Sequence, residues 1–370
     1  MFKQGDVSPA ILYCAVRAAR RSLATNPNDA TTFLLLAKCY IRLQESSSER
    51  AWVEEFPQYL RLRRVQATTA LNRAVELNPQ LAEAHLLLSH MYRSVGCMDL
   101  ALSHLKSFLA ITKQVSKSSS TATNGEPRSA QNQELDELQA TLNDLTTKFT
   151  NDAGRSTVAD RALLAARRGL IGTARDILLS SDVSAFGTEG TKLELELLLV
   201  TGRSWKVLEW ATPEIMDTVG RPEFHWLRAQ AHAAVGDYQS ADMELANLAV
   251  DRNAVSPQQV ANGYAQIVGG LVLEERVGMQ KTMGNLIAAH LGRMDFKSSV
   301  TDVSRILGKR SDASTLRGIL SLEAGETDLA RDAFQAALAA SSSTNDGLKF
   351  PGRTSAQDSL RWIDLQQNKD

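Results

Sequence analysis

The sequence predicts an all-α protein, an α-solenoid in which helix-turn-helix repeats stack side by side. The first observation behind this prediction is an internal pattern of one glycine, one alanine and one large apolar residue. The pattern occurs three times with the same spacing, at Gly96, Ala101 and Leu105, at Gly236, Ala241 and Leu245, and at Gly325, Ala330 and Phe334. Glycine suits a turn between helices, and alanine permits a close helix crossing that the large residue then fills.

The second observation is the dipeptide Asn-Pro, which stops a helix because proline has no backbone N–H to donate. Each copy is followed by a small residue and then a tyrosine at the same spacing: Asn26-Pro27 with Ala37 and Tyr40, and Asn78-Pro79 with Ser89 and Tyr92. Recurrence at a fixed spacing is typical of a repeat array.

Local signals place the individual helices. Ser8 and Pro9 suit the N-cap and first turn of the first helix. Residues 192–200 alternate like a strand at their start, but their leucines and glutamates favour a helix. Weaker helix pairs surround Gly169 and Gly202. The expected helices span residues 8–24, 29–43, 57–77, 82–95, 100–112, 134–149, 192–200, 260–277, 281–291 and 355–367.

Two irregularities interrupt the array. Pro27 and Pro79 are 52 residues apart, well beyond one repeat of about 34 residues. The excess predicts an inserted, extended helix within residues 44–77 that projects beyond the stack. Three arginines of this helix form either a solvated face or a contact for an acidic partner: Arg61, Arg63 and Arg64.

The second irregularity is a stretch rich in Ser, Thr, Asn and Gln, whose composition buries too little apolar surface to offset the entropy of ordering. It is expected to be a flexible linker. The expected segments are N-terminal repeats at 1–112, the linker at 113–132, C-terminal repeats at 133–340, and a polar loop with a capping helix at 341–370. The repeat pattern is absent between residues 257 and 308.

Both ends of the array carry expectations. The first helix corresponds to the second helix of a pair whose first member is missing. Residues 1–7 are expected to cover its apolar face, or else the chain continues from a longer protein. The last helix is expected to place Leu360, Ile363 and Leu365 inward and to cap the array.

The small, aromatic, glycine and proline positions resemble the tetratricopeptide repeat family, in which a degenerate helix-turn-helix unit of about 34 residues recurs. The best match, residues 82–111, agrees at Leu88, Ser89, Tyr92, Gly96, Ala101, Leu105 and Phe108. Residues 223–250 and 311–340 match as well. The resemblance implies about six helix pairs that curve around a concave groove, lined by the first helix of each pair.

The composition limits the function classes. A net charge of -1 argues against a nucleic-acid-binding surface, which needs a basic excess. No apolar run is long enough to span a membrane, and the N-terminus does not read as a signal peptide. The three cysteines lack the spacing of a disulfide or zinc framework. These features favour a reducing, cytoplasmic location.

The sequence nominates no catalytic, cofactor or metal site. The glycine-rich loops that bind phosphates, GxxxxGK[ST] and GxGxxG, are absent. His225 and His232 could share a helix face, but no third ligand accompanies them at a defined spacing. The sequence therefore predicts that the protein is not an enzyme and holds no cofactor.

The resemblance implies which side chains face the groove. Positions that packing does not require, and that could meet a partner, are Lys38, Arg42, His90, Arg93, Trp226 and Gln230. The family's clamp for a C-terminal carboxylate is not reproduced, because Leu34 and Leu86 occupy equivalent places. Lys38, Arg42 and Arg93 would suit an acidic or phosphorylated segment.

The function expected from the sequence is a non-catalytic scaffold or adaptor that binds a protein or peptide partner in the concave groove. The alternative is an accessory or regulatory region of a larger enzyme or membrane-anchored protein, which the missing first half-repeat favours. The sequence does not name the partner or the oligomeric state.

Overall fold

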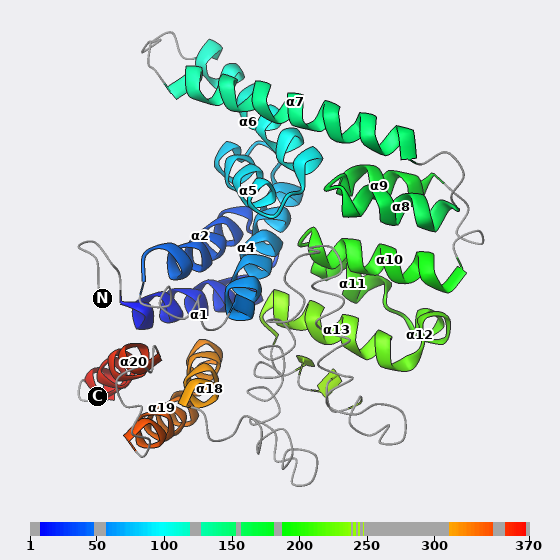
Figure 1. Ribbon diagram of the computed structural model, residues 1–370. Coiled ribbons are helices and arrows are strands. Elements are labelled where there is room, and N and C mark those ends of the chain that lie inside the picture. The colour runs from blue at the N-terminus through cyan, green and yellow to red at the C-terminus, as the bar shows by residue number, and fades with distance from the viewer. Residues whose placement is uncertain are drawn as a thin grey trace.

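The computed structural model describes residues 8–47, 57–118, 127–152, 157–180, 187–237, 240–241, 243–244, 247, 311–342 and 352–367. Every regular element within these ranges is an α-helix, which confirms the predicted all-α fold (Figure 1). The helices are α1 (Pro9–Thr25), α2 (Ala30–Glu45), α4 (Pro57–Leu77), α5 (Ala82–Ser94), α6 (Met98–Ser118), α7 (Pro127–Asp152), α8 (Val158–Arg167), α9 (Ile171–Leu179), α10 (Gly187–Val200), α11 (Ser204–Trp210), α12 (Pro213–Val219), α13 (Arg221–Val235), α18 (Ser311–Ala324), α19 (Thr327–Ser342) and α20 (Gly352–Gln367).

The helices pack as stacked hairpins. The most extensive contacts join α1 with α2, α2 with α4, α5 with α6, α8 with α9, and α18 with α19. Asp29 caps α2 by accepting hydrogen bonds from the backbone N–H groups of Thr31 and Thr32, at 2.9 and 3.1 Å. The main hydrophobic core extends from α1 to α20, and a second, smaller core lies among α10, α11, α12 and α13.

The repeat positions behave as the pattern predicts. Side chains at the small positions are buried, with Ala37, Ser89, Ala101 and Ala330 all at 0% exposure. The turn glycines adopt the positive φ that glycine tolerates: Gly96, Gly169, Gly202, Gly236 and Gly325. The segment whose strand-like alternation was ambiguous is helical in α10.

Residues 63–77 of the inserted helix α4 lie within the stack, so for this part of the helix the predicted projection was wrong. Ala67, Ala70, Leu71 and Ala74 are buried in the core that α4 shares with its neighbours. Contacts with α2, α5 and α13 place α4 at the centre of the array (Figure 1). Arg63, expected either on a solvated face or in contact with an acidic partner, is fully buried within the chain.

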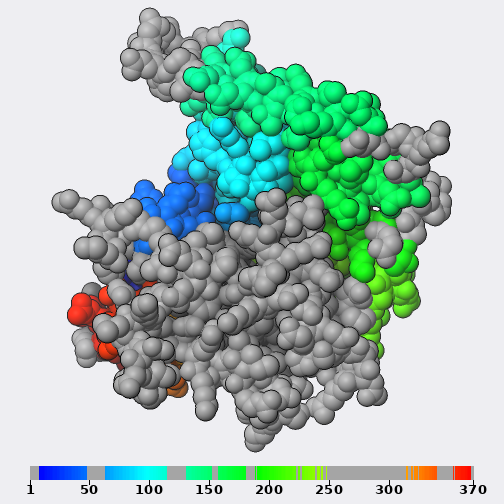
Figure 2. Space-filling model, viewed as in Figure 1, coloured from blue at the N-terminus to red at the C-terminus, as the bar shows by residue number. Residues whose placement is uncertain are grey.

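The predicted linker is too wide. Residues 113–118 belong to α6 and residues 127–132 to α7, whereas 119–126 lie outside the described residues. Polar side chains disfavour a helix only weakly, and α7 gains buried contacts through Leu138 and Phe149. In the space-filling view α7 forms the upper edge of the molecule and borders the surface of α8 and α9 (Figure 2).

The ends of the array also differ from expectation. Helices α18 and α20 pack against α1, so C-terminal helices cover the helix that was expected to lack a partner (Figure 1). In α20, Ile363 is buried as predicted, but Leu365 is 56% exposed, so the prediction for Leu365 was wrong. The Ser8 side chain makes no capping hydrogen bond to α1. The helices predicted at 260–277 and 281–291 lie outside the described residues.

Candidate partner-binding site

A line of polar side chains runs along the buried side of α4. Arg63, Gln66, Thr69 and Asn72 follow one another at intervals of three residues, which places them close together on the helix surface. All four are buried, and we call them the α4 stripe. A buried polar group requires a hydrogen-bonding partner, so their partners determine what packs against this side of α4.

Asn72 and Thr69 bind the turn between α10 and α11. Asn72 Nδ2 donates a hydrogen bond to the carbonyl oxygen of Thr201 at 3.0 Å, and Tyr92 Oη donates to the same oxygen at 2.7 Å. Thr69 Oγ1 lies 3.2 Å from Ser204 Oγ, at the start of α11. Carbonyl groups at a helix end lack an intrahelical donor, and these side chains supply one.

Gln66 and Arg63 bind the ends of two further helices. Gln66 Nε2 donates to the carbonyl oxygen of Ala233, in the last turn of α13, at 3.1 Å. Arg63 forms a fully buried ion pair with Glu323, in the last turn of α18. Amide and guanidinium donors complement the partial negative charge of a helix C-terminus. The α4 stripe therefore holds three hairpin ends that are far apart in the sequence.

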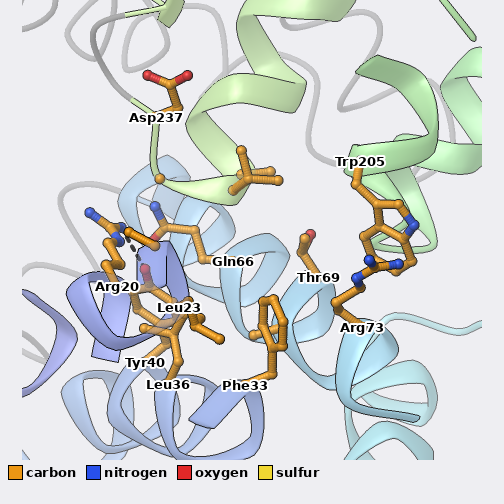
Figure 3. A pocket seen from close by; sticks show the side chains of 15 residues that line it. Arg20, Leu23, Phe33, Leu36, Tyr40, Gln66, Thr69, Arg73, Trp205 and Asp237 are labelled. Atoms are coloured by element: carbon orange, nitrogen blue, oxygen red, sulfur yellow. Dashed lines mark hydrogen bonds between the residues drawn. The ribbon is translucent and has the colours of Figure 1, made fainter. Parts of the chain in front are cut away.

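A pocket of about 380 Å³ lies beside the α4 stripe, between the start of α11 and the turn that follows α13. Its walls come from α1, α2, α4, α11 and the end of α13 (Figure 3). Most lining side chains are apolar or aromatic, including Leu23, Phe33, Leu36, Ala70, Trp205 and Val235. Ligand pockets are commonly about 300–1,000 Å³ and mostly apolar, so this one is large enough for a partner's side chain.

Two arginines stand on opposite sides of the pocket (Figure 3). Arg20 Nη2 donates a hydrogen bond to Tyr40 Oη at 2.5 Å. The guanidinium of Arg73 lies over the indole of Trp205, 5.5 Å from the ring centre. Such cation–π stacking orients both groups, so the pocket has a fixed cation on each side.

Both arginines share their carboxylate partners with other cations. Glu76 lies 2.7 Å from Arg73 Nη1 and 3.8 Å from Lys206 Nζ. Glu323 pairs with Arg63, and its Oε2 also lies 3.5 Å from Arg20 Nη2. Each of these two carboxylates is thus shared between two cations. The Arg73 side chain is 29% exposed, so a ligand carboxylate can approach it.

One carboxylate also lines the pocket. Asp237 follows α13, and its Oδ2 lies 3.3 Å from His232 Nδ1. The interaction with His232 is the main cause that lowers the pKa of Asp237, so this carboxylate is ionised at neutral pH. The imidazole beside it gives the carboxylate a local partner.

Two of the cationic groove residues predicted on α2 and α5, Lys38 and Arg93, already have ionic partners. Lys38 Nζ lies 2.5 Å from Glu83 Oε1, which joins the first helices of two successive pairs. Arg93 Nη1 lies 2.7 Å from Glu134 Oε1, and Arg93 Nη2 lies 3.6 Å from Glu137 Oε2, both on α7. These pairs offset much of the positive charge that was expected to face an acidic partner.

The other predicted groove residues divide into three environments. Arg42 and His90 are exposed on α2 and α5. Gln230 is 7% exposed, which corrects its prediction as a groove residue, because a buried side chain cannot meet a partner without rearrangement. Trp226 belongs to α13, but its side chain lies outside the described residues. None of the five described side chains lines the pocket.

Three further histidines form two separate arrangements. His85 Nδ1 and His104 Nδ1 are 2.9 Å apart, and His85 Nε2 lies 3.1 Å from the carbonyl oxygen of Pro79. His225 Nδ1, on α13, lies 2.7 Å from Oε2 of Glu244, which follows this helix in the chain. Across the described residues, no three His, Cys, Asp or Glu side chains gather in a way that could hold a metal ion.

The described helices include none that is long and apolar enough to cross a membrane. The three cysteines, all described, are free thiols. The compartment itself stays a prediction from the sequence.

Sequence reasoning missed both the pocket and the α4 stripe. The available signal was polar residues at every third position from Arg63 to Asn72, beside the small apolar residues Ala67, Ala70 and Ala74. A helix that has small residues on one side and polar residues on another normally reads as having one solvated face. Only the fold shows that distant hairpins cover this face.

No protein-family model and no curated protein matches the sequence. Among the solved structures that match, two illustrate the similarity, both at low identity. The crystal structure of the P58(IPK) TPR domain is 13% identical, with a TM-score of 0.25, over 96% of this chain and 94% of that chain. A structure of Naa15/Naa10 bound to HypK-THB is 12% identical, with a TM-score of 0.24, over 96% of this chain and 66% of that chain. Because both TM-scores are low, the description of the fold rests on the helix packing above.

Proposed function

We propose that this protein is a non-catalytic helical-repeat scaffold that binds a segment of another protein, and that the pocket beside the α4 stripe is part of its binding site. The pocket is the observation that supports this proposal most directly. It combines an apolar floor with a few fixed polar groups, the composition of sites that accept a ligand side chain. Stacked hairpins supply the extended surface on which a longer segment can lie.

The chemistry of the lining favours binding over reaction. General acid–base catalysis needs a group whose pKa lies near the working pH, and the described lining contains no histidine or cysteine. The Thr69 hydroxyl is already within hydrogen-bonding distance of Ser204. We therefore assign no catalytic residue and no cofactor.

A second contact surface can be proposed on α2 and α5. Arg42 and His90 are exposed there, on the first helices of two successive pairs. An acidic segment crossing these helices would meet Arg42 directly, whereas Lys38 and Arg93 are engaged with glutamates. This surface remains a proposal, and a charge reversal at Arg42 would test it without breaking the Arg93 ion pairs.

The alternative, an accessory region of a larger enzyme or membrane-anchored protein, rests on the half-repeat with which the array begins. Helices α18 and α20 pack against α1, so the apolar face of this helix does not require a neighbour from outside the described residues.

Site-specific photo-cross-linking tests the scaffold proposal. A photoreactive phenylalanine analogue would replace Ala24, an exposed residue that lines the pocket, and in a matched protein it would replace Ser22, an exposed residue of the same helix outside the lining. We expect a defined protein adduct from the Ala24 position that is weaker or absent from the Ser22 position. The captured protein would then be purified, and its affinity for the unmodified full chain measured by calorimetry.

A saturable complex of defined stoichiometry would support the proposal. The same adducts from both positions, or no direct binding after purification, would contradict it.

A further inference from the structure

The pocket has features that select a particular kind of ligand, beyond its apolar lining. This inference rests on the proposed function, because it names the kind of segment that the scaffold would bind. The relevant features are the size of the pocket, the aromatic side chains in its wall, and the two arginines. Each feature restricts the chemistry of the occupant.

Size and lining favour an aromatic side chain. The volume of about 380 Å³ exceeds that of any single side chain, with space left for adjoining backbone atoms. Phe33, Trp205 and Leu36 supply apolar and aromatic surface to its wall. Aromatic rings prefer edge-to-face or offset contacts with other rings, and buried aromatic anchors dominate the energetics of many interfaces.

The charges favour an acidic neighbour of that aromatic residue. Arg73 is held by stacking on Trp205 and remains partly exposed. Its partner Glu76 is shared with Lys206, so a further carboxylate can join without displacing an existing ion pair. Arginine binds carboxylates through paired N–H donors, which adds orientation as well as attraction.

We infer that this pocket binds an aromatic side chain, with a carboxylate one or two residues away, from an extended segment of a partner protein. The aromatic ring enters between Phe33 and Trp205, and the carboxylate binds Arg73. Tryptophan and tyrosine next to aspartate or glutamate provide this combination. The occupant is a segment of a protein, as the scaffold proposal requires, and comparison with a free aromatic acid tests this part of the inference.

Synthetic peptides test the inference on the full chain. Three fluorescein-labelled pentapeptides, blocked at both ends, would carry the cores Glu-Trp-Glu, Lys-Trp-Lys and Glu-Ala-Glu. Fluorescence anisotropy is expected to show the first binding about tenfold tighter than the other two, a difference of the size that one well-placed contact provides. The free acid indole-3-acetate is expected to bind far more weakly than the Glu-Trp-Glu peptide.

Two variants with matched controls locate the site. Ala24→Trp fills the mouth of the pocket and is expected to weaken the Glu-Trp-Glu peptide at least about tenfold, whereas Ser22→Trp leaves it unchanged. Arg73→Gln is expected to abolish the preference for Glu over Lys while keeping the preference for Trp over Ala. Lys148→Gln, which removes another ion-paired surface cation (Lys148 with Asp144, on α7), controls for net charge. Thermal unfolding would verify that each variant folds.

Each contrary outcome overturns one named part of the inference: the ligand class, the binding place or the kind of occupant. Equal affinity for all three peptides, or no saturable binding, would overturn the ligand class while leaving a cross-linked partner, and thus the scaffold proposal, intact. Undiminished binding to Ala24→Trp would place the peptide elsewhere. Indole-3-acetate binding as tightly as the peptide would make this a small-molecule site and overturn the inference.

Discussion

At the scale of single residues, the most consequential feature is a charge pair with no access to water. The side chains of Arg63 and Glu323 are both fully buried, and they come from helices 260 positions apart in the chain. Arg63 also lies over the rings of Tyr13 and Tyr40, at 5.9 and 5.5 Å from their centres. A buried charge of this kind is stable only with its partner in place.

Removal of Glu323 is therefore expected to be costly. Glu323→Ala leaves the Arg63 guanidinium buried without this carboxylate and should lower the free energy of unfolding by about 3 kcal/mol. The solvent-exposed pair of Arg73 and Glu76 provides the comparison, and Glu76→Ala should cost less than about 1 kcal/mol. Urea unfolding followed by circular dichroism measures both. Similar small losses in the two variants would show that the buried pair contributes little.

A second residue-scale expectation concerns pH. Burial, and then the charge of neighbouring His85, lowers the pKa of His104 from its ordinary 6.5 to about 4. Burial also lowers the pKa of His85. The unfolded chain then binds more protons than the folded chain between about pH 6.5 and 4. Stability should be fully present above pH 6.5 and fall by about 2 kcal/mol as the pH drops through this window.

The variant His104→Gln isolates this contribution. It should lose less stability than the parent between pH 6.5 and 4, because one of the two histidines that resist protonation is absent. His90→Gln, at an exposed position of α5, should follow the parent. Unfolding midpoints measured at several pH values test this expectation. If the midpoint falls with pH in parallel for the parent and His104→Gln, the loss of stability does not come from His104.

At the scale of helices and turns, the stack depends on close approach between consecutive glycine turns. The backbone N–H of Met98 donates to the carbonyl oxygen of Gly169 at 3.1 Å. Gly169 has a φ of +77°, and a Cβ at this position would lie 2.0 Å from the carbonyl oxygen of Gly96. Gly96 has a φ of +80°, but a Cβ there would meet nothing within 4 Å.

These two turns form a matched pair for substitution. Gly96→Ala should cost about 1 kcal/mol of stability for the positive φ alone. Gly169→Ala should cost about 3 kcal/mol or more, because rigid backbone must also move. Thermal or urea unfolding of both variants gives the comparison. Equal costs would mean that the turns separate easily, and that the contact does not hold the stack together.

Much of this architecture could be predicted at the level of elements, but not at the level of pairing between distant elements. Proline stops and glycine turns are local signals, so α2, α4 and α5 formed where expected. The partners of Arg63 and Gln66 are far away in the sequence, and no spacing indicates them. The pocket depends on those same pairings, so the predicted groove residues and the pocket residues do not coincide.

At the scale of the whole molecule, the described array returns on itself. Helices α18 and α20 pack on α1, and α13 packs on α4, so C-terminal hairpins complete the environment of N-terminal helices (Figure 1). An open solenoid transmits a local defect only to its neighbours in sequence. A closed arrangement should transmit it from one end of the chain to the other.

Hydrogen exchange can detect that coupling. Phe334 is fully buried in α19, where its ring lies against Gly318 of α18. Phe334→Ala opens a cavity that lowers the free energy of unfolding by about 3–5 kcal/mol. It should raise amide exchange in α18, in α19 and also in α1, which the C-terminal helices cover. Leu105→Ala, a change at an equally buried position in α6, should raise exchange in α5 and α6 first. If Phe334→Ala left exchange in α1 unchanged, the C-terminal helices would be an independent unit that only rests on α1. Increased exchange in α1 would instead show that the two ends of the chain fold as one cooperative unit, as the packing of α18 and α20 on α1 implies.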